Sequence, residues 1–158
     1  MEAVRPAVGD DLPRLVQLAD ELVGAVVSQR GGPLLLDPDD DGRGPEQSGD
    51  RLKQLLEDGQ ALVLAGTLDQ AVTGFALCHL EDRGGHGRHG VLDACYVEPE
   101  ARGVGLGRAL MEALLSWLEE RGCRWVDGTA LPGDREAKNF YESAGFKARM
   151  LTMHREIG

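Results

Sequence analysis

The stretch VEPEARGVGLGRALMEALLSWL, residues 97–118, places a glycine-rich turn directly before a strongly amphipathic segment. In its second half leucines recur at helical spacing, which predicts one long helix. The turn, residues 102–108, holds three glycines and two arginines. N–H groups at a helix N-terminus lack partners within the helix and carry the positive end of its dipole, and glycines let them approach a bulky ligand. The stretch therefore predicts a site for a large anion such as a pyrophosphate.

Spacing distinguishes three kinds of phosphate site. A P-loop needs Gly-Lys-Ser/Thr after a four-residue gap, and the chain has none. A dinucleotide fingerprint needs G-x-G-x-x-G directly after its strand, but Arg108 stands where the third glycine would follow Gly103. Asp127, at the end of the next expected strand, imitates the ribose-binding acid of that fold, so a dinucleotide site is disfavoured but stays open.

Hydrophobic patterns along the chain predict the order β-α-α-β-β-β-α-β-α-β within one domain, residues 1–158. The expected strands are residues 3–8, the two arms of a hairpin over 61–81, 90–98, 123–131 and 146–157; the expected helices are 10–29, 51–59, the helix of the opening stretch and 134–145. A hairpin followed by two βαβ-like crossovers predicts an α/β (α+β) fold with a mixed sheet covered by helices on both faces.

Composition limits the partners of the chain. A net charge of -10 disfavours nucleic acid and anionic membranes and favours a cationic partner. The three cysteines lack CxxC spacing, no export signal opens the chain, and no apolar run reaches membrane-spanning length. These features predict a cytoplasmic protein with reduced thiols.

Two motifs are similar to those of the GNAT superfamily of N-acetyltransferases. RGVGLG, residues 102–107, resembles the pattern [RQ]-x-x-G-x-[GA] that opens the main helix of that family, and YVEPEA before it resembles the family strand ending V-x-P-x-x. DREAKNFYESAGF, residues 134–146, resembles the second signature, N-x-x-A-x-x-F-Y-x-x-x-G-F. The resemblance is specific over residues 91–146. It implies a twisted GNAT-like sheet whose middle strands splay into a V-shaped slot for acetyl-coenzyme A.

The resemblance also implies how acetyl-coenzyme A is held, with its pantetheine arm paired to the strand that ends at Val97. The implied binding residues are Tyr96, Val97, Arg102, Gly103, Val104, Gly105, Leu106, Gly107, Arg108, Asp134 and Tyr141. A backbone N–H near Tyr96 or Val97, where the family strand bulges, is expected to meet the oxyanion. Asp134 replaces the Asn of the second signature and cannot donate a side-chain N–H when ionised, and a helix cap is its alternative role.

The catalytic candidates are three. Tyr141 matches the family tyrosine that protonates the departing thiolate, and its ordinary pKa of about 10 keeps it protonated at neutral pH. Its alternative is an aromatic of the helix core. The base is Asp93, in mid-strand where Asp is disfavoured, or Glu98 at the strand end. Each of these acids is alternatively an ion-paired or surface group. A third alternative is that a chain of water molecules removes the proton without a dedicated base.

The acceptor site is expected beside the segment that joins the first two helices, as in the family. Here that segment contains Asp37, Asp39, Asp40 and Asp41, which form either an acidic wall for a protonated amine or a solvated loop. The expected acceptor is therefore a primary amine of a small cationic molecule or a peptide, attacked directly in a ternary complex. The alternative is a non-catalytic module that senses acyl-coenzyme A or binds a protein, and a homodimer is compatible with either.

The histidines do not predict a metal site. His86 and His89 form an H-x-x-H pattern, but no third ligand is nearby and glycines surround them, which favours a hairpin loop. His79 and His154 fall within strand patterns and are interpreted as structural.

Overall fold

A computed structural model describes residues 1–29 and 49–158. The elements run in the order β1 (Glu2–Pro6), α1 (Leu12–Val27), α3 (Gly49–Glu57), β2 (Ala61–Leu68), β3 (Ala71–Asp82), β4 (Arg88–Val97), α4 (Leu106–Glu120), β5 (Trp125–Gly128) and α5 (Arg135–Ser143), with short 3-10 turns at Gly9–Asp11, Gly84–His86 and Pro99–Ala101. Up to α5 this order is the predicted one. Within the described ranges, no helix is long and apolar enough to cross a lipid bilayer.

Within residues 1–29 and 49–158, five strands form one sheet in the order β1-β2-β3-β4-β5. All neighbours are antiparallel except β4 and β5, which are parallel because α4 connects them. The predicted hairpin turn between β2 and β3 is confirmed: Asp69 and Gln70 have φ of 49° and 72°, the left-handed values that a tight hairpin turn requires.

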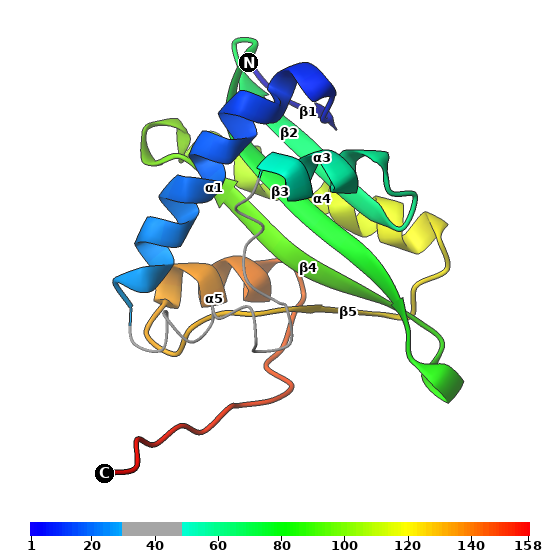
Figure 1. Cartoon of the computed structure of the whole chain (residues 1–158), viewed down its shortest axis with the longest axis vertical. Helices are drawn as coiled ribbons and strands as arrows, with labels where there is room; N and C mark the ends of the chain where they lie inside the picture. Colours follow the sequence, from blue (N-terminus) through cyan, green and yellow to red (C-terminus); the bar gives the residue numbers. More distant parts are fainter. Residues whose placement is uncertain (30–48) are drawn as a thin grey trace.

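Helices cover both faces of the sheet, as predicted (Figure 1). Alternation along β3 divides its side chains between the two layers: Phe75 and Leu77 pack against α1 and α3, whereas Ala76 and Cys78 pack under α4. The α4 leucines of the opening stretch, Leu110 and Leu114 among them, are buried against the sheet. The leucine stripe therefore anchors the glycine-rich turn to a rigid core.

The predicted last strand does not form. Residues 147–158 have no strand structure and their side chains are exposed, and Met150, Leu151, Met153 and Ile157 are 65–87% exposed. A strand needs a ladder partner and a covered face, but β5 at the sheet edge has only four residues instead of the predicted nine. The apolar residues of the tail have the spacing of a strand, but within the described residues no neighbouring strand pairs with them.

One irregularity of β4 lies earlier than expected. Leu77 and Cys78 on β3 pair with Ala94 and Leu92, so Asp93 is the extra residue of a β-bulge. The expectation of a bulge at Tyr96 or Val97 is wrong, because these residues pair regularly with Phe75 and Gly74.

Candidate functional site

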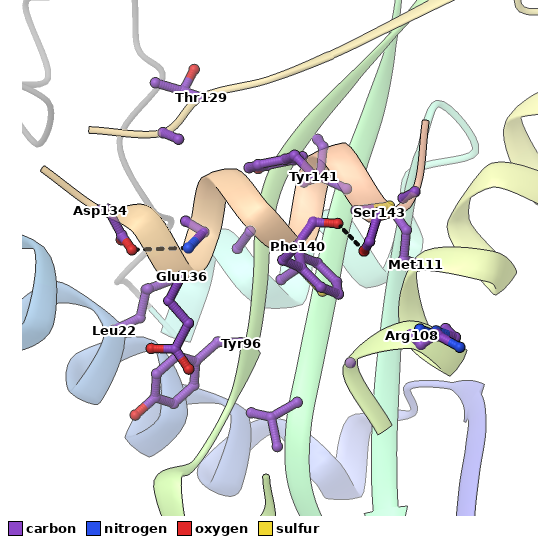
Figure 2. A pocket seen from close by; sticks show the side chains of 18 of the residues that line it. Leu22, Tyr96, Arg108, Met111, Thr129, Asp134, Glu136, Phe140, Tyr141 and Ser143 are labelled. Carbon is purple, nitrogen blue, oxygen red and sulfur yellow. Dashed lines mark hydrogen bonds between the residues drawn. The ribbon is translucent and has the colours of Figure 1, made fainter. Parts of the chain in front are cut away.

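A cleft opens where β4 and β5 separate. The two strands pair only from His89–Trp125 to Leu92–Gly128, and beyond Leu92 that edge of β4 has no strand partner in the described chain. The cleft, of about 1100 Å³, lies between the end of α1, the free edge of β4, the turn before α4, and α5 (Figure 2). This separation agrees with the V-shaped slot that the family resemblance implies.

Most of the predicted site residues line this cleft. Those in its wall are Asp93, Tyr96, Val97, Arg102, Gly103, Gly105, Leu106, Gly107, Arg108, Asp134 and Tyr141. Val104 and Glu98 are not part of the wall. The acidic residues Asp37, Asp39, Asp40 and Asp41 lie outside the described residues, so the structure gives no position for the predicted acidic wall.

The turn before α4 presents free backbone donors to the cleft. The first backbone hydrogen bond of the helix runs from the Ala109 N–H to the Gly105 carbonyl at 3.0 Å. Leu106, Gly107 and Arg108 therefore have N–H groups without a backbone partner in the described chain. Together with the helix dipole, these donors form a cradle that fits the pyrophosphate of coenzyme A.

Two glycines hold the cradle in shape. Gly103 and Gly105 have φ of 90° and 88°, in the left-handed region that side chains other than glycine rarely adopt. A Cβ on either residue would meet no atom within 4 Å. The requirement for glycine here is therefore conformational, and the open space leaves room for a ligand.

We expect Gly105→Ala to weaken coenzyme A binding by about tenfold or more, because the left-handed conformation costs an L-residue about 1–2 kcal/mol and relaxing it moves the donors. Gly122→Ala is the matched control: Gly122 has φ of 76°, open space around it, and a position at the far end of α4. Calorimetric titration and thermal unfolding check both variants. Similar losses of stability with equal coenzyme A affinities would contradict the role of the cradle.

The two arginines of the turn differ in their contacts. Arg102 donates its Nε–H to the Val97 carbonyl at 2.7 Å, and its guanidinium lies 5.6 Å from the centre of the Tyr96 ring. Arg102 therefore braces the end of β4 against the turn. Arg108 lies in the cleft wall apart from the other labelled side chains (Figure 2). The guanidinium of Arg102 is engaged by these contacts, so Arg108 is the better placed of the two arginines to bind a phosphate oxygen.

Tyr141 projects from α5 into the wall of the cleft (Figure 2). Its ring packs edge-on against Phe146, with 5.1 Å between ring centres. Burial, and to a smaller extent the nearby Cys95, Asp134 and Asp93, raise the pKa of the Tyr141 hydroxyl. Among the residues that the structure describes, none hydrogen-bonds to this hydroxyl. Tyr141 is therefore a protonated O–H donor available to a ligand.

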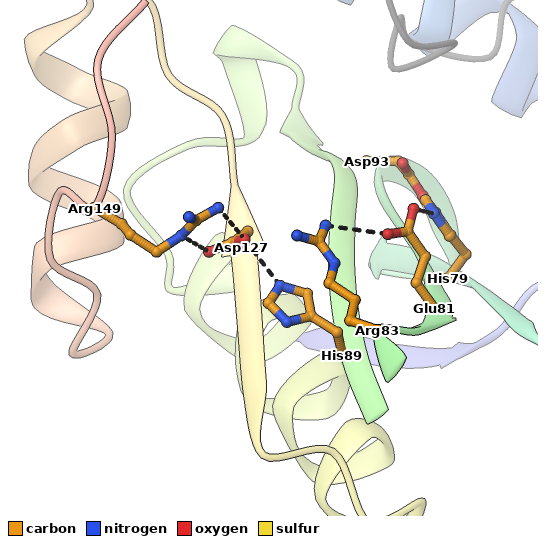
Figure 3. Close-up of polar contacts among 7 residues, drawn as sticks. All are labelled: His79, Glu81, Arg83, His89, Asp93, Asp127 and Arg149. Carbon is orange, nitrogen blue, oxygen red and sulfur yellow. Dashed lines mark hydrogen bonds and ion pairs between the residues drawn. The ribbon is translucent and has the colours of Figure 1, made fainter. Parts of the chain in front are cut away.

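Asp93, the bulged residue, has a partner that the sequence did not reveal. Its Oδ2 lies 2.6 Å from Nδ1 of His79, and the opposite ring nitrogen of His79 lies 3.0 Å from Oε1 of Glu81 (Figure 3). Arg83 donates to the other Glu81 oxygen at 3.1 Å. The hydrogen bond to Asp93, with additional attraction from Glu81, raises the pKa of His79 to about 9. His79 is therefore a cation at neutral pH.

Glu98, the other candidate base, is held outside the cleft. Its Oε2 accepts from Nη2 of Arg14 at 2.5 Å, and its backbone N–H donates to the Thr73 carbonyl at 2.9 Å. Arg14 also donates to the Val72 carbonyl at 2.9 Å, so these contacts join α1, the start of β3 and the end of β4. Of the two acids, Asp93 is the one that lines the cleft.

Asp134 caps α5. Its Oδ1 accepts from the Ala137 N–H at 2.9 Å, as the dashed line at Asp134 in Figure 2 shows. Its Oδ2 accepts from Nε2 of Gln29 at 3.4 Å. The helix-capping alternative for this residue is thus observed. The Gln29 contact also links the end of α1 to the start of α5 across the cleft.

A second polar cluster lies on β5. Asp127 accepts from Arg149 of the C-terminal tail at 3.0 and 2.7 Å and lies 2.8 Å from Nε2 of His89 (Figure 3). Asp127 is therefore engaged by protein groups rather than placed as a ribose-binding acid. Within the described ranges, no group of three or more His, Cys, Asp or Glu side chains is suited to hold a metal ion.

Sequence reasoning missed two residues that contact predicted residues of this site. The strand pattern around His79 indicates a structural role, and the contact with Asp93 arises only from the bulge that brings the two side chains together. Gly128, at the end of β5, was given no role, but a Cβ there would lie 2.5 Å from Cε1 of Tyr141. The available signal for Gly128 was a glycine ending a strand, which marks a close approach of another group.

Comparison with known proteins agrees with this geometry. The model of the acetyltransferase (GNAT) family matches residues 33–146. A curated aminoglycoside N(6')-acetyltransferase type 1 of Stenotrophomonas maltophilia is 32% identical over 103 residues, covering 62% of this chain and 67% of that protein.

Solved structures share the fold. A tetramutant protein of Bacillus halodurans superimposes with a TM-score of 0.83 at 19% identity, over 98% of this chain and 99% of that one. An aminoglycoside acetyltransferase from an uncultured soil metagenomic sample, solved with sisomicin, gives a TM-score of 0.71 at 16% identity, over 99% and 95% of the two chains. At these identities the likeness concerns the fold alone.

Proposed function

Because the chain belongs to the acetyltransferase (GNAT) family, we propose that it transfers an acetyl group from acetyl-coenzyme A to a primary amine of a small cationic molecule. The observation that carries the proposal is one cleft that contains both the glycine-based anion cradle and Tyr141. Acetyl-coenzyme A supplies the activated thioester when it is bound. The cradle of residues 103–108 holds its pyrophosphate, and the free edge of β4 up to Val97 pairs with its pantetheine arm.

Tyr141 acts as the general acid in this proposal. Transfer to an amine requires a proton for the departing thiolate, whose conjugate thiol has a pKa near 8.5. A tyrosine whose pKa is raised by burial keeps its proton at neutral pH and can donate it to the sulfur. N–H groups on the unpaired edge of β4 supply the donors for the oxyanion, because they have no strand partner beyond Leu92 in the described chain.

Cys95 supports direct transfer in a ternary complex over a covalent acyl-enzyme. It lies in the cleft wall, close enough to Tyr141 to influence its pKa. Burial raises the pKa of the Cys95 thiol to about 12. The thiolate is the nucleophilic form, so at neutral pH this thiol is a poor acyl acceptor.

Cys95→Ser is therefore expected to retain kcat within about threefold, since the thiol takes no covalent part. Initial rates of free thiol release, with mass spectrometry of the intact protein after incubation with acetyl-coenzyme A, check this. An acetylated wild-type protein together with an inactive serine variant would contradict direct transfer.

The proposed acceptor is a polycationic amine. The curated relative from Stenotrophomonas maltophilia carries the name of an aminoglycoside acetyltransferase, and the net charge of -10 attracts cationic molecules. A peptide amine is the other acceptor class that a cationic preference allows. Asp93, on the wall of the cleft with only 12% of its side chain exposed, is the proposed group that receives the proton of the attacking amine.

The test is release of free thiol from acetyl-coenzyme A across sisomicin, spermidine, free amino acids and short basic peptides. Turnover on sisomicin or spermidine supports the proposed acceptor class, and turnover on peptides alone replaces it with a peptide amine. If no amine is acetylated, calorimetric titration with coenzyme A distinguishes a module that senses acyl-coenzyme A from a protein that does not bind it.

A further inference from the structure

We propose that His79 is a positioning residue for Asp93 and that this pair carries the amine proton out of the cleft into a second cavity under α3. The inference rests on the proposed function, since Asp93 there receives the proton of the acceptor. It goes further because it assigns a role to His79, which lies outside the cleft wall, and states where the proton of the amine goes.

The β-bulge creates the pair. On β3, His79 and Glu81 continue the row of alternate side chains that begins at Phe75 and Leu77 on the α1/α3 face. The extra residue in β4 places Asp93 beside this row, with Oδ2 2.6 Å from Nδ1 of His79. Without the bulge, the register of the two strands would be shifted by one residue. The contact is therefore specific to this irregular register.

Asp93 lies between two cavities. It lines the main cleft, and it also lines a smaller cavity of about 180 Å³ together with His79 and residues of α3 and its following turn. Among the described residues, it is the one that lines both. The His79 side chain is 31% exposed, so the ring reaches water from the side of the smaller cavity. The pair thus forms a bridge between the cleft and the solvent.

The charges around His79 explain its protonation. Asp93 of β4 and Glu81 of β3 flank its two ring nitrogens, and Arg83 is bound to Glu81. From the α3 side, Arg51 and Asp58 also line the smaller cavity. The two adjacent carboxylates raise the pKa of His79 to about 9, so the resting pair is a carboxylate with an imidazolium. An imidazolium carries a proton on both ring nitrogens, so the ring can take up the proton of the amine only after it has lost one of its own.

The proton balance follows from this resting state. The imidazolium first releases one proton to water in the smaller cavity, which leaves a neutral ring. The attacking amine then gives one proton to the Asp93 carboxylate, and the neutral imidazole takes it up, which restores the carboxylate and the imidazolium. Each turnover moves one proton from the amine nitrogen to the smaller cavity. The proton for the departing thiolate comes separately from Tyr141, whose tyrosinate then regains one proton from water in the cleft. The proton released from the amine and the proton taken up by Tyr141 therefore balance at each turnover.

Titration of the ring tests the pair without any substrate. The chain has four histidines, so the imidazole NMR signals of His79 can be assigned with the His79→Gln variant. In the wild-type protein His79 is expected to titrate near pH 9, and in Asp93→Asn its pKa is expected to fall towards its ordinary value of about 6.5. A wild-type His79 that titrates near 6.5, or is unaffected by Asp93→Asn, would overturn the proposal.

Kinetics test the proton route. The kcat/KM of wild type and of His79→Gln is measured from pH 6.5 to 10 with the same amine, so the ionisation of the amine affects both equally. Because the neutral fraction of His79 grows about tenfold per pH unit below its pKa, the ratio of wild type to variant is expected to rise about tenfold per unit up to pH 9 and then level off. A ratio that does not change with pH means a purely structural His79 and overturns the proposal.

His86→Gln is the matched control, because His86 lies exposed in the turn between β3 and β4 and contacts neither acid through its side chain in the described chain. Its ratio to wild type is expected to be flat. If no amine in the panel is acetylated, the proposed function fails, whereas the NMR titration still decides whether Asp93 and His79 are coupled. The two failures are therefore distinguishable.

Discussion

Tyr141→Phe is expected to lower kcat by about 10- to 1000-fold while the affinity for coenzyme A changes little. The substitution removes only the hydroxyl that protonates the thiolate, and general acid catalysis contributes effects of this order. The ring contacts with Phe140 and Phe146 remain, so the fold and the cleft wall are preserved. Steady-state rates and calorimetric titration with coenzyme A separate the two quantities.

The result does not depend on which amine is used, because the leaving group is the coenzyme A thiolate for every acceptor. Thermal unfolding serves as the control for Tyr141→Phe, and an unchanged Tm confirms that only chemistry was altered. A kcat within twofold of wild type would exclude Tyr141 as the acid and favour its alternative role as an aromatic of the helix core.

Gly128→Ala is expected to lower kcat by about as much as Tyr141→Phe. A Cβ at this position would lie 2.5 Å from Cε1 and 2.6 Å from the hydroxyl of Tyr141, so the ring must move away from its place on the cleft wall. Overpacking of this kind also costs about 1–3 kcal/mol of stability. Kinetics and thermal unfolding of the variant measure the two effects.

The mechanism of this loss is tested by a double mutant. If Gly128→Ala acts by displacing Tyr141, the substitution adds little further loss of kcat in a Tyr141→Phe background, because the hydroxyl is already absent. Gly133→Ala is the matched control, since a Cβ there meets nothing within 4 Å and the backbone φ is not left-handed. Fully additive losses in the double mutant would show that Gly128 acts independently of Tyr141.

Much of the cleft could be predicted from local chain chemistry. The glycines of residues 103–107 and the leucines behind them specify a turn and a helix N-terminus whatever the rest of the chain does, and Gly103 and Gly105 adopt the left-handed conformation that only glycine favours. The order of elements up to α5 follows equally from hydrophobic periodicity. These properties depend on residues that are close together in the sequence, so the amino-acid sequence is sufficient to predict them.

The different surroundings of Asp93 and Glu98 could be seen only in the folded chain. Both acids belong to one strand and its end, and the sequence keeps Asp93, as the unusual acid in mid-strand, and Glu98 as candidates for the base. Strand pairing places a bulge at Asp93 and sets it beside His79, whereas Glu98 forms an ion pair with Arg14 from another element. Register is decided by packing on both faces of a sheet, which is a non-local property.

The same distinction explains the tail and Gly128. An apolar pattern at residues 146–157 predicts a strand, but a strand forms only where a neighbouring edge has free backbone groups of matching length, and β5 has four residues. The need for glycine at position 128 arises because α5 places Tyr141 against β5. Backbone conformation and amphipathic faces are encoded locally, whereas the contacts that position Asp93, His79 and Tyr141 exist only after distant segments have packed together.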